Sequence, residues 1–325
     1  MARSQQPPLY QNPNHARLAK SACPAYTRSM PEPAKFKPAP DRPSTLPMDA
    51  QLVVLADAVE RIGPARVRHS GRNAFNHLRK SWELHPVDAE MSYFRALTAE
   101  EEAASALILA LRQQRYPGAK RLDPQIHAHK AAVWVILEAI VRGYTDKKMP
   151  RPQISIGKEG RPRIRIDVDI GPMIDSDGPY WVHSPDPFHT VIHSDEKGPF
   201  ELHRWAKELA QIAGPNKSIM RYVRELANNR NRVLYANEKG VPSIIFPDEL
   251  ILERLERVKW IMVVVIGVLQ TKTLQLLVIQ ALEALLIAVE RFEGEGFAFP
   301  QFDQSAANLS IEQQPDGSFV SGFKA

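Results

Sequence analysis

Apolar residues recur at helical spacing along most of the chain beyond residue 48. In segment 51–62, Leu52, Leu55 and Val59 fall on one helical face, and Gly63-Pro64 follows directly. Segment 98–111 opens with Thr98-Ala99-Glu100-Glu101, which has the form of a capping box, and continues with apolar residues at helical spacing. We therefore expect a helix that begins at Thr98, within a mainly α protein built as a helical bundle.

Two long apolar stretches lie near the C-terminal end of the chain. They cover residues 260–269 and 274–289, and the polar residues 270–273 separate them. A membrane-spanning helix needs about 20 predominantly apolar residues, and neither stretch reaches that length alone. We predict two buried core helices and no membrane span.

The hydrophobic period changes from helical to alternating after residue 147. Residues 154–156 and 163–170 alternate on either side of a glycine-containing turn, with Ile164, Ile166 and Val168 on one face. The pattern predicts a small β-hairpin insertion over residues 147–198. Residues 296–325 are expected to form a tail with a short hairpin around Pro315-Asp316-Gly317.

The first 48 residues differ in composition from the rest of the chain. They hold ten of the 27 prolines, and seven basic side chains against two acidic ones. Proline removes a backbone donor and fixes φ, so residues 1–48 are predicted to be a disordered basic tail. The formal net charge of +5 therefore belongs to this tail. The N-terminal half of the bundle is expected at 49–146 and the C-terminal half at 199–295.

Cysteine usage and the N-terminal residues indicate the compartment. Cys23 is the only cysteine, so no intramolecular disulfide can form. Residues 1–21 lack the uninterrupted apolar run of a secretory signal. Together these features predict a cytoplasmic protein.

Arginine is concentrated between residues 221 and 232, where Glu225 is the only acidic residue. The four arginines are Arg221, Arg224, Arg230 and Arg232. Arg230 shares a helical stripe with Val223 and Ala227, and a charged group on an apolar stripe needs a partner or a cleft. The position suits a phosphate-binding arginine, or an arginine that pairs with a carboxylate in the core.

The segment 230–235, Arg-Asn-Arg-Val-Leu-Tyr, resembles the motif of the HEPN superfamily, helical domains found in many bacterial defence and toxin systems. In that motif an arginine and usually a polar residue are followed, after a few positions, by a histidine. Arg230-Asn231 matches the first part, and Tyr235 stands where the histidine is expected. The turn that follows, up to Pro242, is similar to the abortive-infection AbiV-like branch. The resemblance covers roughly residues 70–142 and 200–290.

The resemblance implies that the ligand is RNA and that no metal or cofactor takes part. The residues implied for phosphate binding are Arg224, Arg230, Asn231 and Arg232. The residues implied for catalysis are Arg230, Tyr235, Glu102, His127 and His129.

Tyr235 alters what such a site can do. A histidine with a pKa near 6.5 exchanges protons at neutral pH, whereas a tyrosine with a pKa near 10 is a poor general base. The tyrosine leaves two functions open. Either the site cleaves RNA, with arginine stabilising the phosphate charge, or it binds RNA without cleaving it, with Tyr235 stacking on a base.

The remaining polar groups each have a structural interpretation. Carboxylates at 100–102 suit a helix start, and Glu102 is the one that the capping box explains least. His129 lies near the apolar stripe of its helix, as a buried, hydrogen-bonded histidine would. His183, His189 and His193 cluster in the insertion, but the cysteines of structural zinc sites are missing, so no metal site is predicted.

We therefore expect an RNA-binding HEPN-like protein of a bacterial defence or toxin-type system, with metal-independent ribonuclease activity as an extension. The alternative is a non-enzymatic interaction protein whose helical body docks a partner and whose tail acts as a tether. The apolar C-terminal helices also suggest a homodimer. A groove that brings Arg230 to His127 and His129 would favour RNA; Arg230 paired with Glu102 in the core would favour the interaction protein.

Overall fold

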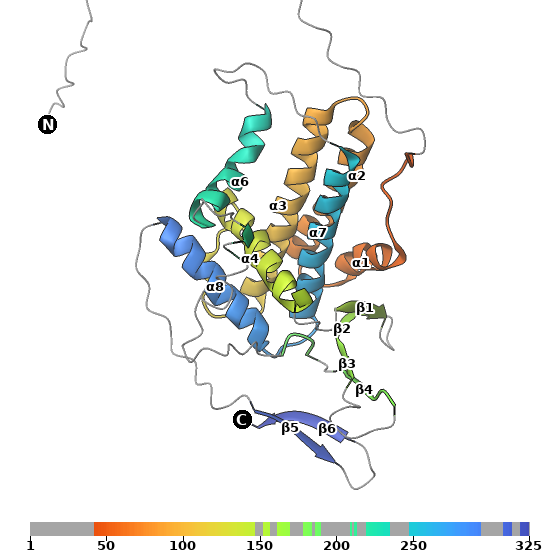
Figure 1. The fold of residues 1–325 in the computed structure, drawn as a ribbon, viewed down its shortest axis with the longest axis vertical. Coiled ribbons are helices and arrows are strands. Elements are labelled where there is room, and N and C mark those ends of the chain that lie inside the picture. The colour runs from red at the N-terminus through yellow and green to blue at the C-terminus, as the bar shows by residue number, and fades with distance from the viewer. Residues whose placement is uncertain are drawn as a thin grey trace, which may run out of the picture. The chain divides into compact units, whose positions relative to one another are not determined.

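The chain folds mainly into α-helices, as the hydrophobic pattern predicts (Figure 1). The computed structural model describes residues 42–146, 152–156, 161–169, 178–183, 186–189, 209, 211–212, 219–234, 247–293, 308–313 and 319–324. The long helices are α1 (Ala50–Arg61), α2 (Ala65–Leu84), α3 (Ala89–Gln113), α4 (His127–Asp146), α6 (Ile219–Leu234), α7 (Asp248–Leu269) and α8 (Leu276–Glu293), with a short 3-10 turn η1 (Ala119–Arg121). None of the described helices is long and apolar enough to span a membrane.

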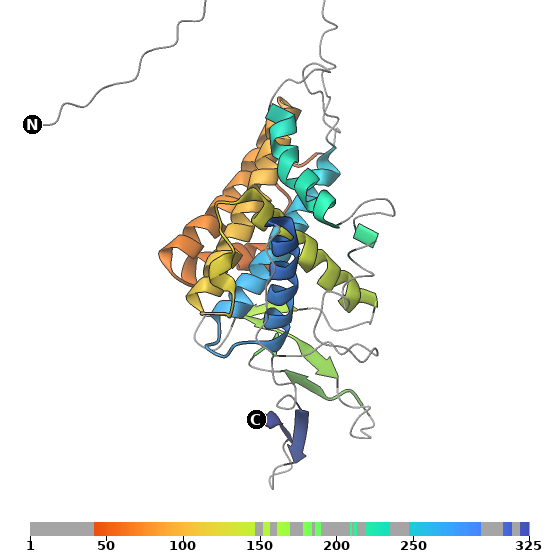
Figure 2. The ribbon, with the colours of Figure 1, turned by 90° about the vertical axis from the view of Figure 1, so that its left-hand side faces the viewer.

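Helix α7 runs through the middle of the bundle and contacts α1, α2, α3 and α4 (Figures 1 and 2). It is buried over most of its circumference because nearly every position from 261 to 268 is apolar. Helices α7 and α8 correspond to the two predicted core helices. The polar residues at 270–273 end the first of them, as the sequence indicates.

Helices α2 and α3 form the most extensive helix pair. Helix α3 presents fully buried alanines, which let its neighbours approach closely; they include Ala96, Ala99, Ala103 and Ala106. At the end of the pair, Ser81 Oγ donates to the Ser92 carbonyl oxygen at 2.7 Å, and Ser92 Oγ donates to the Ser81 carbonyl oxygen at 2.8 Å. This reciprocal pair satisfies two hydroxyls that are buried away from water.

The capping-box prediction for the start of α3 is wrong. The helix begins nine residues before Thr98, at Ala89, and the Asp88 carboxylate caps it by accepting from the backbone N–H of Met91 at 2.8 Å. Thr98 lies inside the helix, where its hydroxyl donates to the Phe94 carbonyl oxygen at 2.8 Å. A threonine can satisfy its hydroxyl in this way at an interior position, so a local cap pattern did not mark the true terminus.

The small β insertion contains the predicted hairpin. Strands β1 (Gln153–Ile156) and β2 (Pro162–Arg165) pair antiparallel, with Ile154 opposite Ile164. The expectation of one strand through residue 170 is wrong, because a second pair forms between β3 (Asp167–Asp169) and β4 (Trp181–His183). Ile164 and Ile166 are buried as predicted, whereas Val168 is 39% exposed. The predicted C-terminal hairpin is present as β5 (Asn308–Gln313) and β6 (Phe319–Lys324).

Two glutamines at the α7–α8 corner hold the insertion against the bundle. The Gln270 side chain accepts from the Ile164 N–H at 2.7 Å and donates to the Ile164 carbonyl oxygen at 3.1 Å. The buried Gln275 side chain accepts from the Phe188 N–H at 2.7 Å and donates to the Gly267 carbonyl oxygen at 2.8 Å. Each side-chain amide both accepts and donates a hydrogen bond. Backbone groups of Ile164 and Phe188, which lie far from the corner in sequence, are therefore hydrogen-bonded there.

The end of the predicted tail belongs to the bundle, which corrects its boundary. The Arg42 guanidinium bonds the Asp248 carboxylate at 2.7 Å, donates to the Trp82 carbonyl oxygen at 2.7 Å and lies 3.9 Å from the centre of the Trp82 ring. Leu46 is buried as well. Residues 42–48 are therefore ordered on α2 and the start of α7, and residues 1–41 lie outside the described part of the chain.

Candidate functional site

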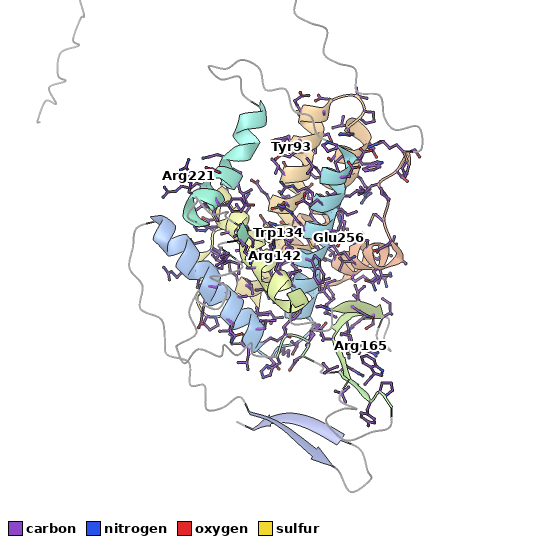
Figure 3. All side chains as sticks on the ribbon, in the orientation of Figure 1. Tyr93, Trp134, Arg142, Arg165, Arg221 and Glu256 are labelled. Atoms are coloured by element: carbon purple, nitrogen blue, oxygen red, sulfur yellow. The ribbon has the colours of Figure 1, made fainter. Side chains whose placement is uncertain are left out.

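Helix α6 carries the arginine-rich segment on the outside of the bundle, where it contacts α3, α4 and α8. Val223 is buried against the bundle, while Arg221 and Arg224 are exposed. Figure 3 shows Arg221 on the outer side of α6. Arg221 Nε bonds the Glu225 carboxylate at 3.1 Å, one helical turn along. This division of α6 into an apolar inner face and a basic outer face follows from its helical spacing.

The motif residues themselves lie at the C-terminal end of α6. Arg230, Asn231 and Arg232 are in its last turns, and their side chains lie outside the described part of the structure. Tyr235 follows the helix and is also outside the described residues. The expected meeting of Arg230 with His127, His129 or Glu102 therefore stays a prediction.

A buried cluster of charges connects α3 and α7. The Glu100 carboxylate forms ion pairs with Arg254, and with Arg257 Nη1 at 3.5 Å. Each of the three side chains is 11% exposed, so the cluster is largely shielded from water. Burial acts to raise the pKa of Glu100, but the charges and hydrogen bonds of Arg254 and Arg257 outweigh it and hold the pKa below its ordinary value.

Aromatic side chains from α4 and α6 border this cluster. The Arg257 guanidinium lies 4.9 Å from the centre of the Trp134 ring and also bonds Glu253. Tyr222 on α6 has a raised pKa, first because it is partly buried and then because of the nearby Glu138 charge. The cluster thus lies close to the inner face of α6, and the Glu253 carboxylate balances the second of its two guanidinium charges.

His127, at the N-terminal end of α4, is the more accessible of the two predicted catalytic histidines. Its side chain is 45% exposed, and its Nδ1 lies 2.7 Å from a Glu101 carboxylate oxygen. The other oxygen of Glu101 accepts from Lys130 Nζ at 3.1 Å. A carboxylate at this distance orients the imidazole ring.

His129 matches the structural interpretation of a buried, hydrogen-bonded histidine. It is 2% exposed, and its Nδ1 accepts the backbone N–H of Asp123 at 2.8 Å. The bond holds the turn that precedes α4. Glu102 is partly buried on α3, and the carboxylate that forms the ion pairs within the core is Glu100.

Within the described residues, no three His, Cys, Asp or Glu side chains are grouped so that they could hold a metal ion. His183 and His189 belong to the described part of the insertion, and His193 lies outside it.

Sequence reasoning did not identify the buried cluster, although a signal for it was present. Arg254 follows Ile251 by three positions and precedes Val258 by four, so it lies on the apolar stripe of α7. Glu100 lies on the alanine-rich stripe of α3 in the same way. Two opposite charges on the apolar stripes of two helices indicate a buried ion pair.

Comparison of the chain with models of protein families, with curated proteins and with solved structures finds no match.

Proposed function

We propose that the chain binds single-stranded RNA along the basic outer face of α6. The observation that carries this proposal is the exposure of Arg221 and Arg224 on a helix that bears two further arginines, Arg230 and Arg232, toward its C-terminal end. Arginine binds phosphate through a planar set of donors, and neutralising phosphates accounts for most of the affinity in non-specific RNA binding. The resemblance of segment 230–235 to the HEPN motif supports the same ligand.

Cleavage of the bound RNA would be an extension of this function, and His127 is the described residue best suited to it. Its contact with Glu101 has the arrangement of a base oriented by a carboxylate. His129 is a poor candidate because it is buried and its Nδ1 is used by the backbone of Asp123. We therefore place binding first and cleavage second.

Fluorescence anisotropy with a labelled single-stranded RNA tests the binding proposal. The variants are Arg224→Gln, Arg230→Gln and Arg232→Gln, measured over a series of salt concentrations. Arg79→Gln is a matched control, because Arg79 is an exposed arginine on α2. We expect each α6 variant to bind more weakly and to reduce the slope of log affinity against log salt by about 0.7, the value for one phosphate contact on a single strand.

The result that would overturn the proposal is equal RNA affinity in the wild type, the α6 variants and the control. A second arm measures RNA degradation in the presence of EDTA. Loss of cleavage in His127→Gln, with RNA affinity and circular dichroism unchanged, would support the catalytic extension. If the wild type does not cleave RNA, the proposed function is RNA binding alone.

The alternative function, a non-enzymatic interaction protein, is favoured by a different observation. The ionisable residues at the centre of the bundle, Glu100 and Arg254, are bonded to each other and shielded from solvent. Such a cluster supports a fold more directly than it supports chemistry. Absence of RNA binding in the assay above would favour this function.

A further inference from the structure

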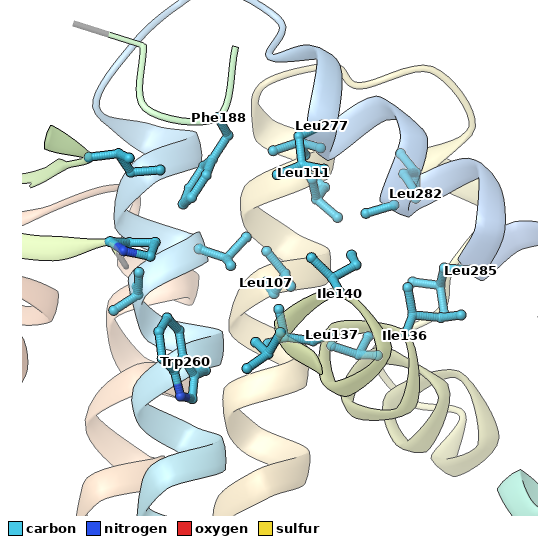
Figure 4. A pocket seen from close by; sticks show the side chains of 18 residues that line it. Leu107, Leu111, Ile136, Leu137, Ile140, Phe188, Trp260, Leu277, Leu282 and Leu285 are labelled. Carbon is cyan, nitrogen blue, oxygen red and sulfur yellow. The ribbon is translucent and has the colours of Figure 1, made fainter. Parts of the chain in front are cut away.

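A cavity of about 110 Å³ lies inside the bundle, between α3, α4, α7 and α8 (Figure 4). Its lining is apolar throughout and includes Leu107, Leu137, Trp260 and Leu282. The β insertion contributes Pro152, Ile166 and Phe188 to the same wall. The cavity is therefore completed by a part of the chain that lies outside the helical framework.

The wall formed by Phe188 is held firmly. Its backbone N–H donates to Gln275 Oε1 at 2.7 Å, and its carbonyl oxygen accepts from the Leu277 N–H at 3.1 Å. Its ring lies against Gly267 of α7, where the lack of a side chain makes room for it. The shape of the cavity on this side is thus fixed before any ligand enters.

Water is a poor occupant of this space. A buried water needs two to four polar partners, and the lining residues are all apolar. Apolar cavities of about 150 Å³ in protein cores stay dry and bind benzene. An empty cavity also lowers stability in proportion to its volume, because the surrounding atoms lose their packing partners.

Part of the cavity lining is accessible to solvent. Val141, Trp260 and Val264 are only partly buried, whereas Leu107, Leu137 and Leu282 are buried. The volume is too small for a helix of a protein partner, which is about 10 Å across with its side chains. Both the size and the lining suit a small hydrocarbon group.

We propose that this cavity binds a neutral hydrocarbon group of about the size of a benzene ring. The group is either a free small aromatic molecule or the end of an acyl chain, since both present the same apolar surface. The proposal is independent of RNA binding on α6, because it uses a different set of residues.

The test is calorimetric titration and thermal unfolding of the full chain with two probes, benzene and octanoate. Ala281→Leu and Val264→Leu place additional carbon atoms in the cavity, since both residues line it. Ala131→Leu is the matched control, because Ala131 is partly buried on α4 and is not among the lining residues.

We expect at least one probe to bind the wild type and the control saturably and to raise their Tm. Ala281→Leu and Val264→Leu should raise the Tm without probe and weaken probe binding at least tenfold. Binding of benzene would indicate a free aromatic ligand, and binding of octanoate alone would indicate a chain end. The proposal is overturned if neither probe binds the wild type, or if the filling variants bind as well as the control does. A lower Tm in both filling variants, with no probe binding to the wild type, would mean that side chains of the chain itself fill the space.

Discussion

Phe188 packs on Gly267 so closely that a Cβ at residue 267 would lie 2.1 Å from the Phe188 Cε2 atom. Gly267 is in the interior of α7, where glycine costs about 1 kcal/mol relative to alanine. The ring of Phe188 explains why glycine is nevertheless present. The contact also joins the β insertion to the central helix of the bundle.

We predict that Gly267→Ala lowers the free energy of unfolding by about 2 kcal/mol, because the new methyl group displaces the Phe188 ring. The same change in a Phe188→Ala background should instead raise it by about 1 kcal/mol, since only the gain in helix propensity remains. Urea denaturation of the four proteins measures both values. Gly178→Ala is the control, because nothing lies within 4 Å of a Cβ at that position. Equal effects of Gly267→Ala in the two backgrounds would contradict the contact.

The buried ion cluster leads to a second prediction. Glu100→Ala should destabilise the protein by about 3–5 kcal/mol, because two buried guanidinium groups lose their shared partner. Replacing Glu100, Arg254 and Arg257 together by leucine or methionine should recover most of this loss. Chemical denaturation of the single and triple variants measures the difference, and Glu102→Ala, two residues along α3, is the comparison. A triple variant less stable than Glu100→Ala would argue that the cluster itself stabilises the fold.

The same cluster sets a dependence on acid. The pKa of Glu100 is lowered in the folded protein, so its contribution to stability is fully present above the ordinary glutamate pKa. That contribution is lost as the pH falls below this value toward the lowered folded pKa. We predict that Glu100→Gln flattens the decline in stability below pH 4.5, the ordinary glutamate value. Parallel acid-unfolding curves for the two proteins would contradict this.

The pKa of Glu283 on α8 is shifted in the opposite direction to that of Glu100. Partial burial raises its pKa to about 6 from an ordinary value of 4.5. The folded protein therefore favours the protonated form, and stability falls as the pH rises between these two values. We predict that Glu283→Gln raises the free energy of unfolding by about 1 kcal/mol at pH 8 and by little at pH 4, after allowing for solvent screening. Thermal unfolding at both pH values tests this, with the exposed Glu249→Gln as control.

Arg42 and Asp248 allow a largely buried ion pair to be compared with an exposed one. Arg42 is 7% exposed and also stacks on Trp82, so Arg42→Ala should cost about 2–3 kcal/mol. Arg42→Lys should recover only part of this, because an ammonium group cannot supply the planar fork. Arg72→Ala removes a pair whose side chains are 58% and 39% exposed and should change the free energy of unfolding much less than Arg42→Ala does, because solvent screens the exposed pair. Similar losses for Arg42→Ala and Arg72→Ala would contradict this ranking.

The helical bundle and its hairpins could be predicted because hydrophobic periodicity is a local property. Helices α7 and α8 and strands β1 and β2 follow directly from it. The start of α3 could not be predicted in this way, because Asp88 and Thr98 are both plausible caps and tertiary packing decides between them. The division of the strand after Arg165 could not be predicted for a similar reason. Strand β3 pairs with β4, and the alternation of apolar and polar residues does not show which strands will pair.

The candidate site was less predictable than the fold. The buried positions of Val223 and His129 agree with what spacing suggests. The Glu100–Arg254 pair was missed because its members are 154 residues apart, and a single sequence does not show which stripes face each other. Gln270 lies between the two apolar stretches and Gln275 lies inside the second. Neither position indicates which backbone groups the side chain bonds, although both side chains hold the insertion in place.

The central position of α7 has a consequence for how the chain is made. Helices α1, α2 and α3 leave the ribosome long before α7 does, yet α7 covers their apolar faces. Those faces are then exposed to solvent during synthesis, and exposed apolar surface promotes aggregation. The ion pair between Glu100 and Arg254 closes a loop of 154 residues, and such distant contacts form slowly. Expression of this protein should therefore depend on chaperones that hold the first helices until the last ones are synthesised.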